Sequence, residues 1–152
     1  MHWAANAVVV CATLAALVAC VLLHYEGLVV AQRRIGLPHR HMRLRVLHAV
    51  SMVIVLHVLE IWLFGMAFWL VLRWPECGSI GGTDAVHFLD HIYLSAMSFT
   101  TVGFGDVTPV GPIRFMAATE ALAGLVLITW SASFMYLEME QYWREDRESR
   151  GK

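Results

Sequence analysis

The sequence has few charged residues, and this scarcity excludes several classes of protein. Charged side chains make up 15% of the 152 residues, against 59% hydrophobic ones, and their clustering leaves long neutral runs. A soluble domain of this size would expose far too much apolar surface, so the composition predicts an integral membrane protein. The net charge of −1 gives no reason to expect binding to nucleic acid.

Cysteine and the features of a cleaved signal are also scarce. The three cysteines, Cys11, Cys20 and Cys77, lack the spacing of a metal site. The residues ending at Cys20 resemble a lipoprotein cleavage site, but no Lys or Arg precedes the apolar run, which continues past Cys20. We therefore expect a retained helix here. Neither an internal repeat nor a local nucleophile–base pair is present, so we expect neither a repeat protein nor an enzyme, and no cofactor.

Three apolar stretches are long enough to cross a bilayer, for which about 20 residues suffice. The first lies within residues 1–32, the second covers 46–72 and the third covers 113–138. The first lacks arginines at every third position and so does not resemble a voltage sensor. His24, next to Tyr25 and Glu26, is interpreted as a residue of the membrane interface.

The loop at residues 33–45 predicts the orientation of the chain. It contains five arginines and no acidic residue. A short basic loop between two spans favours the cytoplasmic side, where it anchors to lipid headgroups more simply than to nucleic acid. We therefore expect a multi-pass protein of the cell membrane with its N-terminus outside and the tail at 139–152 in the cytoplasm.

Between the second and third spans, the pattern predicts an exposed turret and a short buried helix. The turret covers residues 73–83, and Thr83 or Asp84 is suited to cap the helix that follows. Residues 84–99 are too few to span the bilayer and carry polar side chains throughout. Such a helix is tolerated at membrane depth when it is buried in protein, which predicts a re-entrant helix.

The most specific pattern follows at residues 100–106, which read Thr-Thr-Val-Gly-Phe-Gly-Asp. Glycine takes positive φ at little cost, so Gly103 and Gly105 can turn successive carbonyls to one side of an extended strand. A row of carbonyl oxygens suits a dehydrated cation, and the Thr101 hydroxyl can add one more ligand.

This stretch closely resembles the signature of potassium-channel selectivity filters, with Phe104 where many members carry Tyr. Residues 46–138 resemble the two-span pore module of prokaryotic potassium channels in the order outer helix, pore helix, filter and inner helix, and the helix at 1–32 is additional. The resemblance implies an all-α membrane protein with three transmembrane helices, a re-entrant pore helix and a filter. One chain supplies one filter strand, so it also implies a homotetramer around a fourfold axis.

The resemblance also assigns roles to residues of the filter. The backbone carbonyls that replace the water shell of K⁺ are those of Thr101, Val102, Gly103 and Phe104. Gly105 would permit the filter backbone. Asp106 either attracts cations at the outer mouth or braces the filter through a pore-helix side chain such as Tyr93, and we favour bracing. Met97 stands where some relatives carry Glu, which removes one brace.

Polar residues within the spans are candidates for gating. A carboxylate there is costly unless it is paired, neutral or hydrated, so Glu60 and Glu120 are expected to be buried in protein. His57 and Glu60 lie three residues apart on one helical face and can pair. Glu120 can reach Ser95 or Ser98 behind the filter, and we favour a structural lock there over a proton sensor.

Other residues leave two interpretations open. Gly124 is either a hinge of the inner helix or a site of close helix packing. A helical stripe either lines the central cavity or packs against lipid and helices, and it comprises Leu125, Ile128, Ala132 and Tyr136. His87 and His91 have a spacing that suits Zn²⁺, although ordinary polar packing is favoured. Cys77 is a minor candidate for an intersubunit disulfide.

These patterns predict a passive potassium-selective channel. A weakly selective cation channel is the alternative within that class, because Phe104 lacks the Tyr hydroxyl that helps to hold the width of the filter. A non-conducting scaffold subunit is the alternative from another class, but scaffolding needs no row of carbonyls. The expected partners are three further copies of the chain, K⁺ and the lipid bilayer, without nucleic acid.

Overall fold

The computed structural model describes residues 2–35 and 42–150 of the chain, so residues 36–41 in the middle of the predicted basic loop lie outside the described part. The elements follow in the order α1 (His2–Ile35), α2 (Met42–Val71), the 3₁₀ helix η2 (Pro75–Cys77), β1 (Ser79–Gly81), α3 (Phe88–Phe99), β2 (Thr108–Val110) and α4 (Arg114–Arg150). Three helical segments are long and apolar enough to cross a membrane, namely Trp3–Arg33, Val46–Val71 and Arg114–Glu140. The chain is therefore an all-α membrane protein.

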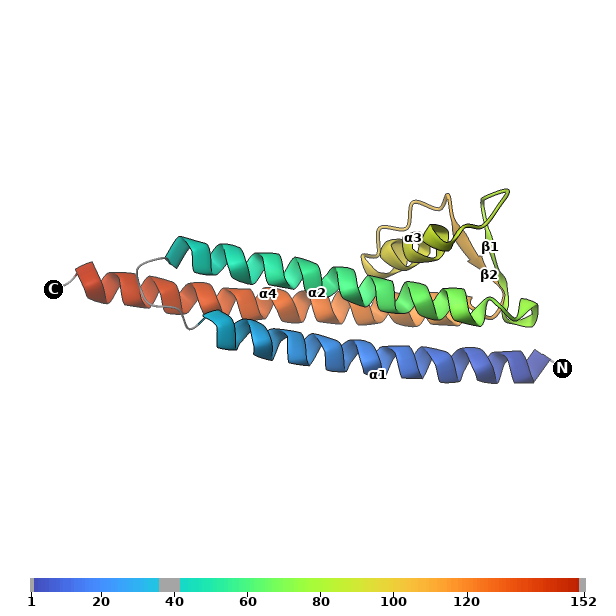
Figure 1. Ribbon diagram of the computed structural model, residues 1–152, viewed down its shortest axis with the longest axis horizontal. Helices are drawn as coiled ribbons and strands as arrows, with labels where there is room; N and C mark the ends of the chain where they lie inside the picture. Colours follow the sequence, from blue (N-terminus) through green and yellow to red (C-terminus); the bar gives the residue numbers. More distant parts are fainter. Residues whose placement is uncertain (1, 36–41, 151–152) are drawn as a thin grey trace.

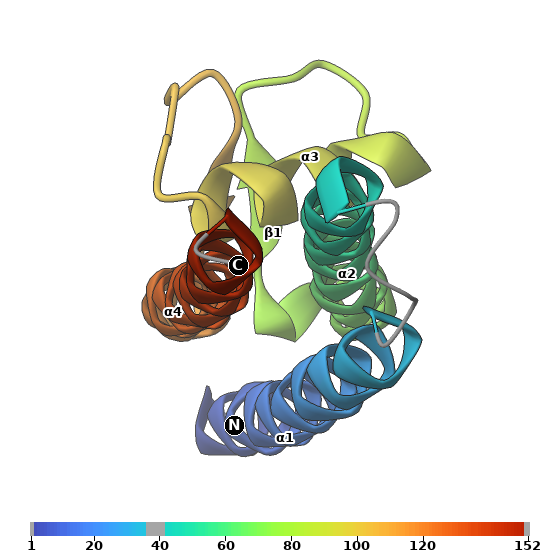
Figure 2. The ribbon, with the colours of Figure 1, turned by 90° about the vertical axis from the view of Figure 1, so that its left-hand side faces the viewer.

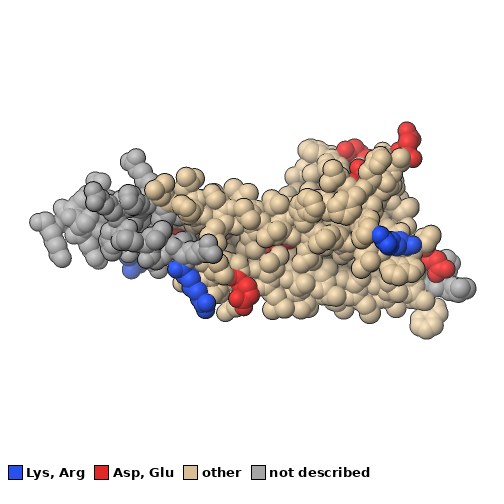
Figure 3. All heavy atoms as spheres, viewed as in Figure 1, with Lys and Arg blue, Asp and Glu red and all other residues tan. Residues whose placement is uncertain are grey.

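The three long helices run side by side, and α3 lies across α2 and α4 near one end of the bundle (Figure 1). Seen along the bundle, α1 lies on the side of α2 and α4 that faces away from α3 (Figure 2). The N-terminus and the segments around α3 share one end of the molecule, and the C-terminus lies at the other. On the face shown in Figure 3, charged side chains lie toward the two ends, and the middle is almost wholly uncharged.

Helix α1 packs on α2 and α4 through a stripe of mostly small residues. Its buried residues recur every three or four positions, and they are Ala5, Val9, Thr13, Ala16, Cys20, His24, Leu28 and Ala31. Small side chains let helices approach closely where lipid tails provide no hydrophobic drive for association. The additional helix is thus bound to the pore module of its own chain.

The core lies where α2, α3 and α4 cross. Its largest fully buried apolar side chains are Phe64, Phe68, Phe99, Ile113, Met116 and Leu127. Because these side chains fix α3 against the two long helices, the position of the segment that follows α3 is also fixed.

The re-entrant helix is shorter than the sequence predicted. It begins at Phe88, not at residue 84, and its first turn is capped by Asp90, whose carboxylate accepts the His87 amide N–H at 2.6 Å. Thr83 does not cap this helix, because its hydroxyl donates to the Ala85 carbonyl at 3.1 Å in a local turn. The predicted cap at Thr83 or Asp84 was therefore wrong.

The turret contains a two-stranded ribbon that the sequence analysis missed. β1 pairs antiparallel with β2, with Ser79 opposite Val110 and Gly81 opposite Thr108. The ribbon joins the segment before α3 to the segment after the filter stretch.

The last helix is longer than predicted, because α4 continues through the expected tail to Arg150. Pairs of opposite charge four residues apart stabilise a helix, and Arg144 lies 2.7 Å from Glu140 in such a pair.

Candidate functional site

Along the backbone from residue 101 to residue 105, the sign of φ alternates from one residue to the next. Thr101, Gly103 and Gly105 have φ values of 59°, 52° and 81°, whereas Val102 and Phe104 between them do not have positive φ. Positive φ is uncommon for a residue with a side chain, and at Thr101 it costs on the order of 1–3 kcal/mol. The alternation is the conformation expected for a strand whose successive carbonyls turn to the same side.

The start of this strand is tied to the end of α3 by its amides. The Thr101 N–H donates to the Ser98 carbonyl at 3.0 Å, and the Gly103 N–H donates to the Met97 carbonyl at 3.3 Å. The Thr100 hydroxyl also donates to the Ala96 carbonyl at 2.6 Å. Since the amides are used in this way, the carbonyls of the strand are left for another partner.

The C-terminal end of the strand is held by a side-chain contact. The Tyr93 hydroxyl donates to the Asp106 carboxylate, whose two oxygens lie 2.8 and 3.0 Å from the hydroxyl oxygen. This hydrogen bond raises the pKa of the Tyr93 phenol, and desolvation and the Asp106 charge act in the same direction. The contact is the one that the bracing interpretation of Asp106 requires.

The strand is open on its other sides in the single chain. Val102 is 52% exposed and Phe104 is 73% exposed. A Cβ atom built on Gly103 or Gly105 would meet no atom within 4 Å, so it is their φ values and not the space around them that favour glycine. The exposed side chains of Val102 and Phe104 are free to contact neighbouring copies of the chain.

Glu120 lies behind the strand, fully buried, and contacts Ser95 as the sequence analysis suggested, whereas Ser98 bonds within its own helix. The Ser95 hydroxyl also lies 2.8 Å from the Ile61 carbonyl. A hydroxyl can both donate and accept, so Ser95 can donate to the Ile61 carbonyl while it accepts from Glu120 when the Glu120 carboxyl carries a proton. The cluster joins α2, α3 and α4.

Gly124 lies where α4 touches the end of α3. A Cβ atom built there would lie 2.8 Å from the carbonyl carbon of Phe99 and nearer still to its oxygen. Helix α4 is continuous through this position. The geometry supports the interpretation of Gly124 as a site of close packing.

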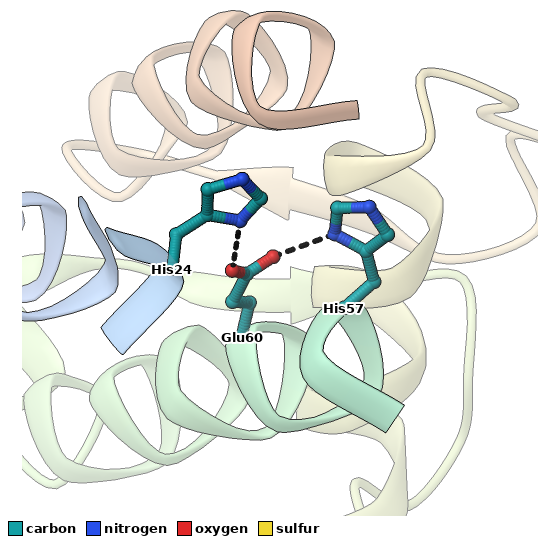
Figure 4. A group of neighbouring side chains, drawn as sticks. All are labelled: His24, His57 and Glu60. Atoms are coloured by element: carbon teal, nitrogen blue, oxygen red, sulfur yellow. Dashed lines mark hydrogen bonds and ion pairs between the residues drawn. The ribbon is translucent and has the colours of Figure 1, made fainter. Parts of the chain in front are cut away.

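His57 and Glu60 pair as predicted, but a third residue joins them. His57 Nδ1 lies 2.7 Å from Glu60 Oε2, and His24 Nδ1 of α1 lies 2.7 Å from Glu60 Oε1. Figure 4 shows both imidazoles directed toward the two carboxylate oxygens. The placement of His24 at the membrane interface was wrong, because α1 continues to Ile35 and His24 belongs to its buried stripe.

The sequence contains a pattern from which the burial of His24 could have been predicted. The polar or small residues Thr13, Ala16, Cys20 and His24 follow one another at intervals of three or four in an otherwise apolar helix. That spacing marks the helix face that packs against protein.

Two alternatives for the turret are not supported. The described residues contain one group of three ligand-type side chains close enough for a metal ion, which is His24, His57 and Glu60, and neither His87 nor His91 belongs to it. Cys77 is 2% exposed and lies in the core, so it does not face a neighbouring subunit as an exposed turret cysteine would. Burial, with the Glu76 charge nearby, raises the pKa of its thiol.

The stripe proposed to line a cavity is uncovered in the single chain. Leu125, Ile128 and Tyr136 are 54%, 38% and 62% exposed, and Ala132 is exposed as well. This face of α4 is therefore available to a cavity, to lipid or to another subunit.

Comparisons with known proteins agree on the pore region. The family described as ion channel matches residues 46–141, more than half of the chain. Protein LctB of Geobacillus stearothermophilus is 43% identical over 53 residues, which cover 35% of this chain and 40% of that protein. Protein LctB of Bacillus caldotenax is 50% identical over 38 residues, or 25% of this chain and 28% of that protein.

The chain thus spans less than half the length of either curated relative that it matches, and no solved structure matches it. The family match covers both helices of the pore module, the re-entrant helix and the strand with alternating φ. On this evidence the chain is a membrane protein that belongs to the ion-channel family.

Proposed function

We propose that the protein is a potassium-selective channel whose filter is formed by residues 100–106 of four identical chains. The observation that carries this proposal is the alternation of positive φ at Thr101, Gly103 and Gly105, together with the anchoring of the strand's amides to α3. Rings of carbonyls from such strands replace the hydration shell of K⁺.

The tetramer is part of the same proposal. One strand cannot surround an ion, and the exposed Val102 and Phe104 side chains offer contacts to neighbouring strands. The C-terminal end of α3 carries a partial negative charge from its helix dipole and would help to hold a cation below the filter. With the basic loop in the cytoplasm, the end of the bundle that carries the N-terminus and the filter stretch faces outside. The chemistry of this site is ion transport and not catalysis.

The test is uptake of ⁸⁶Rb⁺ into proteoliposomes that contain the purified protein, with Na⁺ as competitor. We expect Rb⁺ uptake that excess Na⁺ does not suppress. Gly103→Ala should abolish most of it, because alanine disfavours positive φ by roughly 1 kcal/mol in each of four strands, and a Cβ there meets no atom of its own chain within 4 Å.

Gly81→Ala is the matched control. Its Cβ would meet only the side chains of Val110 and Thr108 and the Thr108 carbonyl, none nearer than 3.3 Å, and Gly81 is not among the glycines with positive φ. Equal uptake of Rb⁺ and Na⁺ would contradict potassium selectivity and favour the weakly selective channel. No uptake by correctly assembled protein would favour the scaffold.

A further inference from the structure

The buried cluster that joins α1 to α2 is not needed for a carbonyl filter. His24 and Glu60 are fully buried, and the His57 side chain is 17% exposed. The two imidazole rings stack with centroids 5.6 Å apart and an interplanar angle of 26°. Aromatic rings enclose them, since Trp130 lies 5.2 Å from His24 and Phe99 lies 5.7 Å from His57.

The cluster is not fully satisfied by its own hydrogen bonds. Glu60 binds one nitrogen of each imidazole, and the second ring nitrogen of His24, Nε2, is buried without a hydrogen-bond partner among the described residues. A buried polar atom of this kind costs about 1–3 kcal/mol. Since this atom is the ring nitrogen that does not bind Glu60, the atoms that converge on one point are the two Nδ1 atoms and the carboxylate oxygens.

The donor set fits a transition metal. One ligand atom from each of His24, His57 and Glu60 lies within 4.8 Å of the others. Tetrahedral Zn²⁺ with bonds of about 2.0–2.1 Å holds its ligand atoms roughly 3.3 Å apart, a spacing that small side-chain rotations can reach. Two imidazoles and one carboxylate form a common zinc ligand set with one position open.

Cys20 does not complete this set. It is fully buried and shares one face of α1 with His24, but among the described residues the ligand atoms that lie close together are those of His24, His57 and Glu60. The fourth position is therefore left to water, as in zinc sites with three protein ligands.

We propose that His24, His57 and Glu60 form a binding site for a divalent transition-metal ion of the zinc type, which links α1 to α2. Imidazole ligands select such ions over Mg²⁺ and Ca²⁺, which prefer oxygen. The partly exposed side of His57 is the entrance for the ion. The ion would occupy the place of the protons that Glu60 now shares with the imidazoles.

The test uses the full-length chain, purified in detergent, stripped with a chelator and titrated with Co²⁺ as a spectroscopic substitute for Zn²⁺. We expect the intense visible bands of tetrahedral Co²⁺ and their loss when Zn²⁺ displaces the cobalt. Zn²⁺ should also raise the melting temperature of the protein.

Two variants separate metal binding from a merely structural role. Glutamine at position 24 or 57 can still donate a hydrogen bond to Glu60 but is a poor metal ligand, so His24→Gln and His57→Gln should weaken Co²⁺ binding at least about 100-fold. His48→Gln is the matched control, because His48 is exposed on α2 and bonds to the Leu44 carbonyl. Size-exclusion chromatography verifies that each variant is folded.

The proposal is overturned if the wild type binds no Co²⁺ with tetrahedral bands, or if both glutamine variants bind it as the wild type does. These readouts are independent of conduction, so they stand whether or not the protein passes K⁺.

Discussion

Replacing Gly124 with alanine tests how α4 supports the filter stretch. The added methyl group would lie 2.8 Å from the Phe99 carbonyl carbon, whereas ordinary van der Waals contact begins at 3.4 Å. The two backbones would therefore have to separate by more than about 0.6 Å. Helix α3 also packs closely on α2, where a Cβ on Gly65 would lie 2.9 Å from the Ile92 Cα, so a shift at Gly124 disturbs this contact as well.

Overpacking of this kind costs about 1–3 kcal/mol in each chain. We expect a lower melting temperature of the purified protein and reduced ⁸⁶Rb⁺ uptake, since Thr100 and Thr101 follow Phe99 directly. Gly81→Ala again serves as the matched control, because the nearest neighbour of its Cβ would be the Val110 side chain at 3.3 Å. If the Gly124→Ala protein has unchanged stability but an altered balance of open and closed channels, the packing interpretation is refuted. The interpretation of Gly124 as a hinge is then favoured.

Two further predictions concern the polar contacts around the strand. Because the pKa of Tyr93 is raised in the folded chain, the stabilisation from its bond to Asp106 is present below the ordinary tyrosine value of about 10 and is lost as the pH rises through the raised pKa. Thermal melts over alkaline pH should show this loss in the wild type, and Tyr93→Phe should lack it while being less stable at neutral pH. Glu120→Gln should keep wild-type stability and the same uptake between about pH 5 and 8, because its amide donates to Ser95 as the protonated carboxyl does. Glu120→Ala should lower the free energy of unfolding by about 1–3 kcal/mol, because it leaves the buried Ser95 hydroxyl with fewer hydrogen-bond partners. If uptake by the wild type depends strongly on pH and uptake by Glu120→Gln does not, Glu120 is a proton sensor instead.

The sequence predicts the transmembrane helices well because the bilayer imposes a simple rule of length and composition. Residues 46–72 and 113–138 were expected, and Val46–Val71 and Arg114–Glu140 are the segments apolar enough to span. The contacts of Tyr93 with Asp106 and of Glu120 with Ser95 were also anticipated, since helical rise and strand length limit what these side chains can reach.

The features that the sequence missed depend on tertiary contacts. His24 looks like an interface residue because it is followed by Tyr25 and Glu26, and only the packing of α1 on α2 directs it to Glu60. Cys77 looks exposed because it lies in a glycine-rich turret, yet η2 folds it into the core. The β1–β2 ribbon carries no alternating pattern, since each strand has three residues and one contains Pro109.

The same ribbon bears on the order in which the channel forms. By joining the two ends of the segment that contains α3 and the filter stretch, it closes that loop within one chain, and the alternating φ values are already present in the single protomer. If four copies assemble as proposed, each chain has already lost the conformational entropy of its filter backbone before the four chains meet. Assembly would then be the docking of preshaped surfaces, and its rate would depend on the density of protomers in the bilayer more than on slow refolding at the fourfold axis.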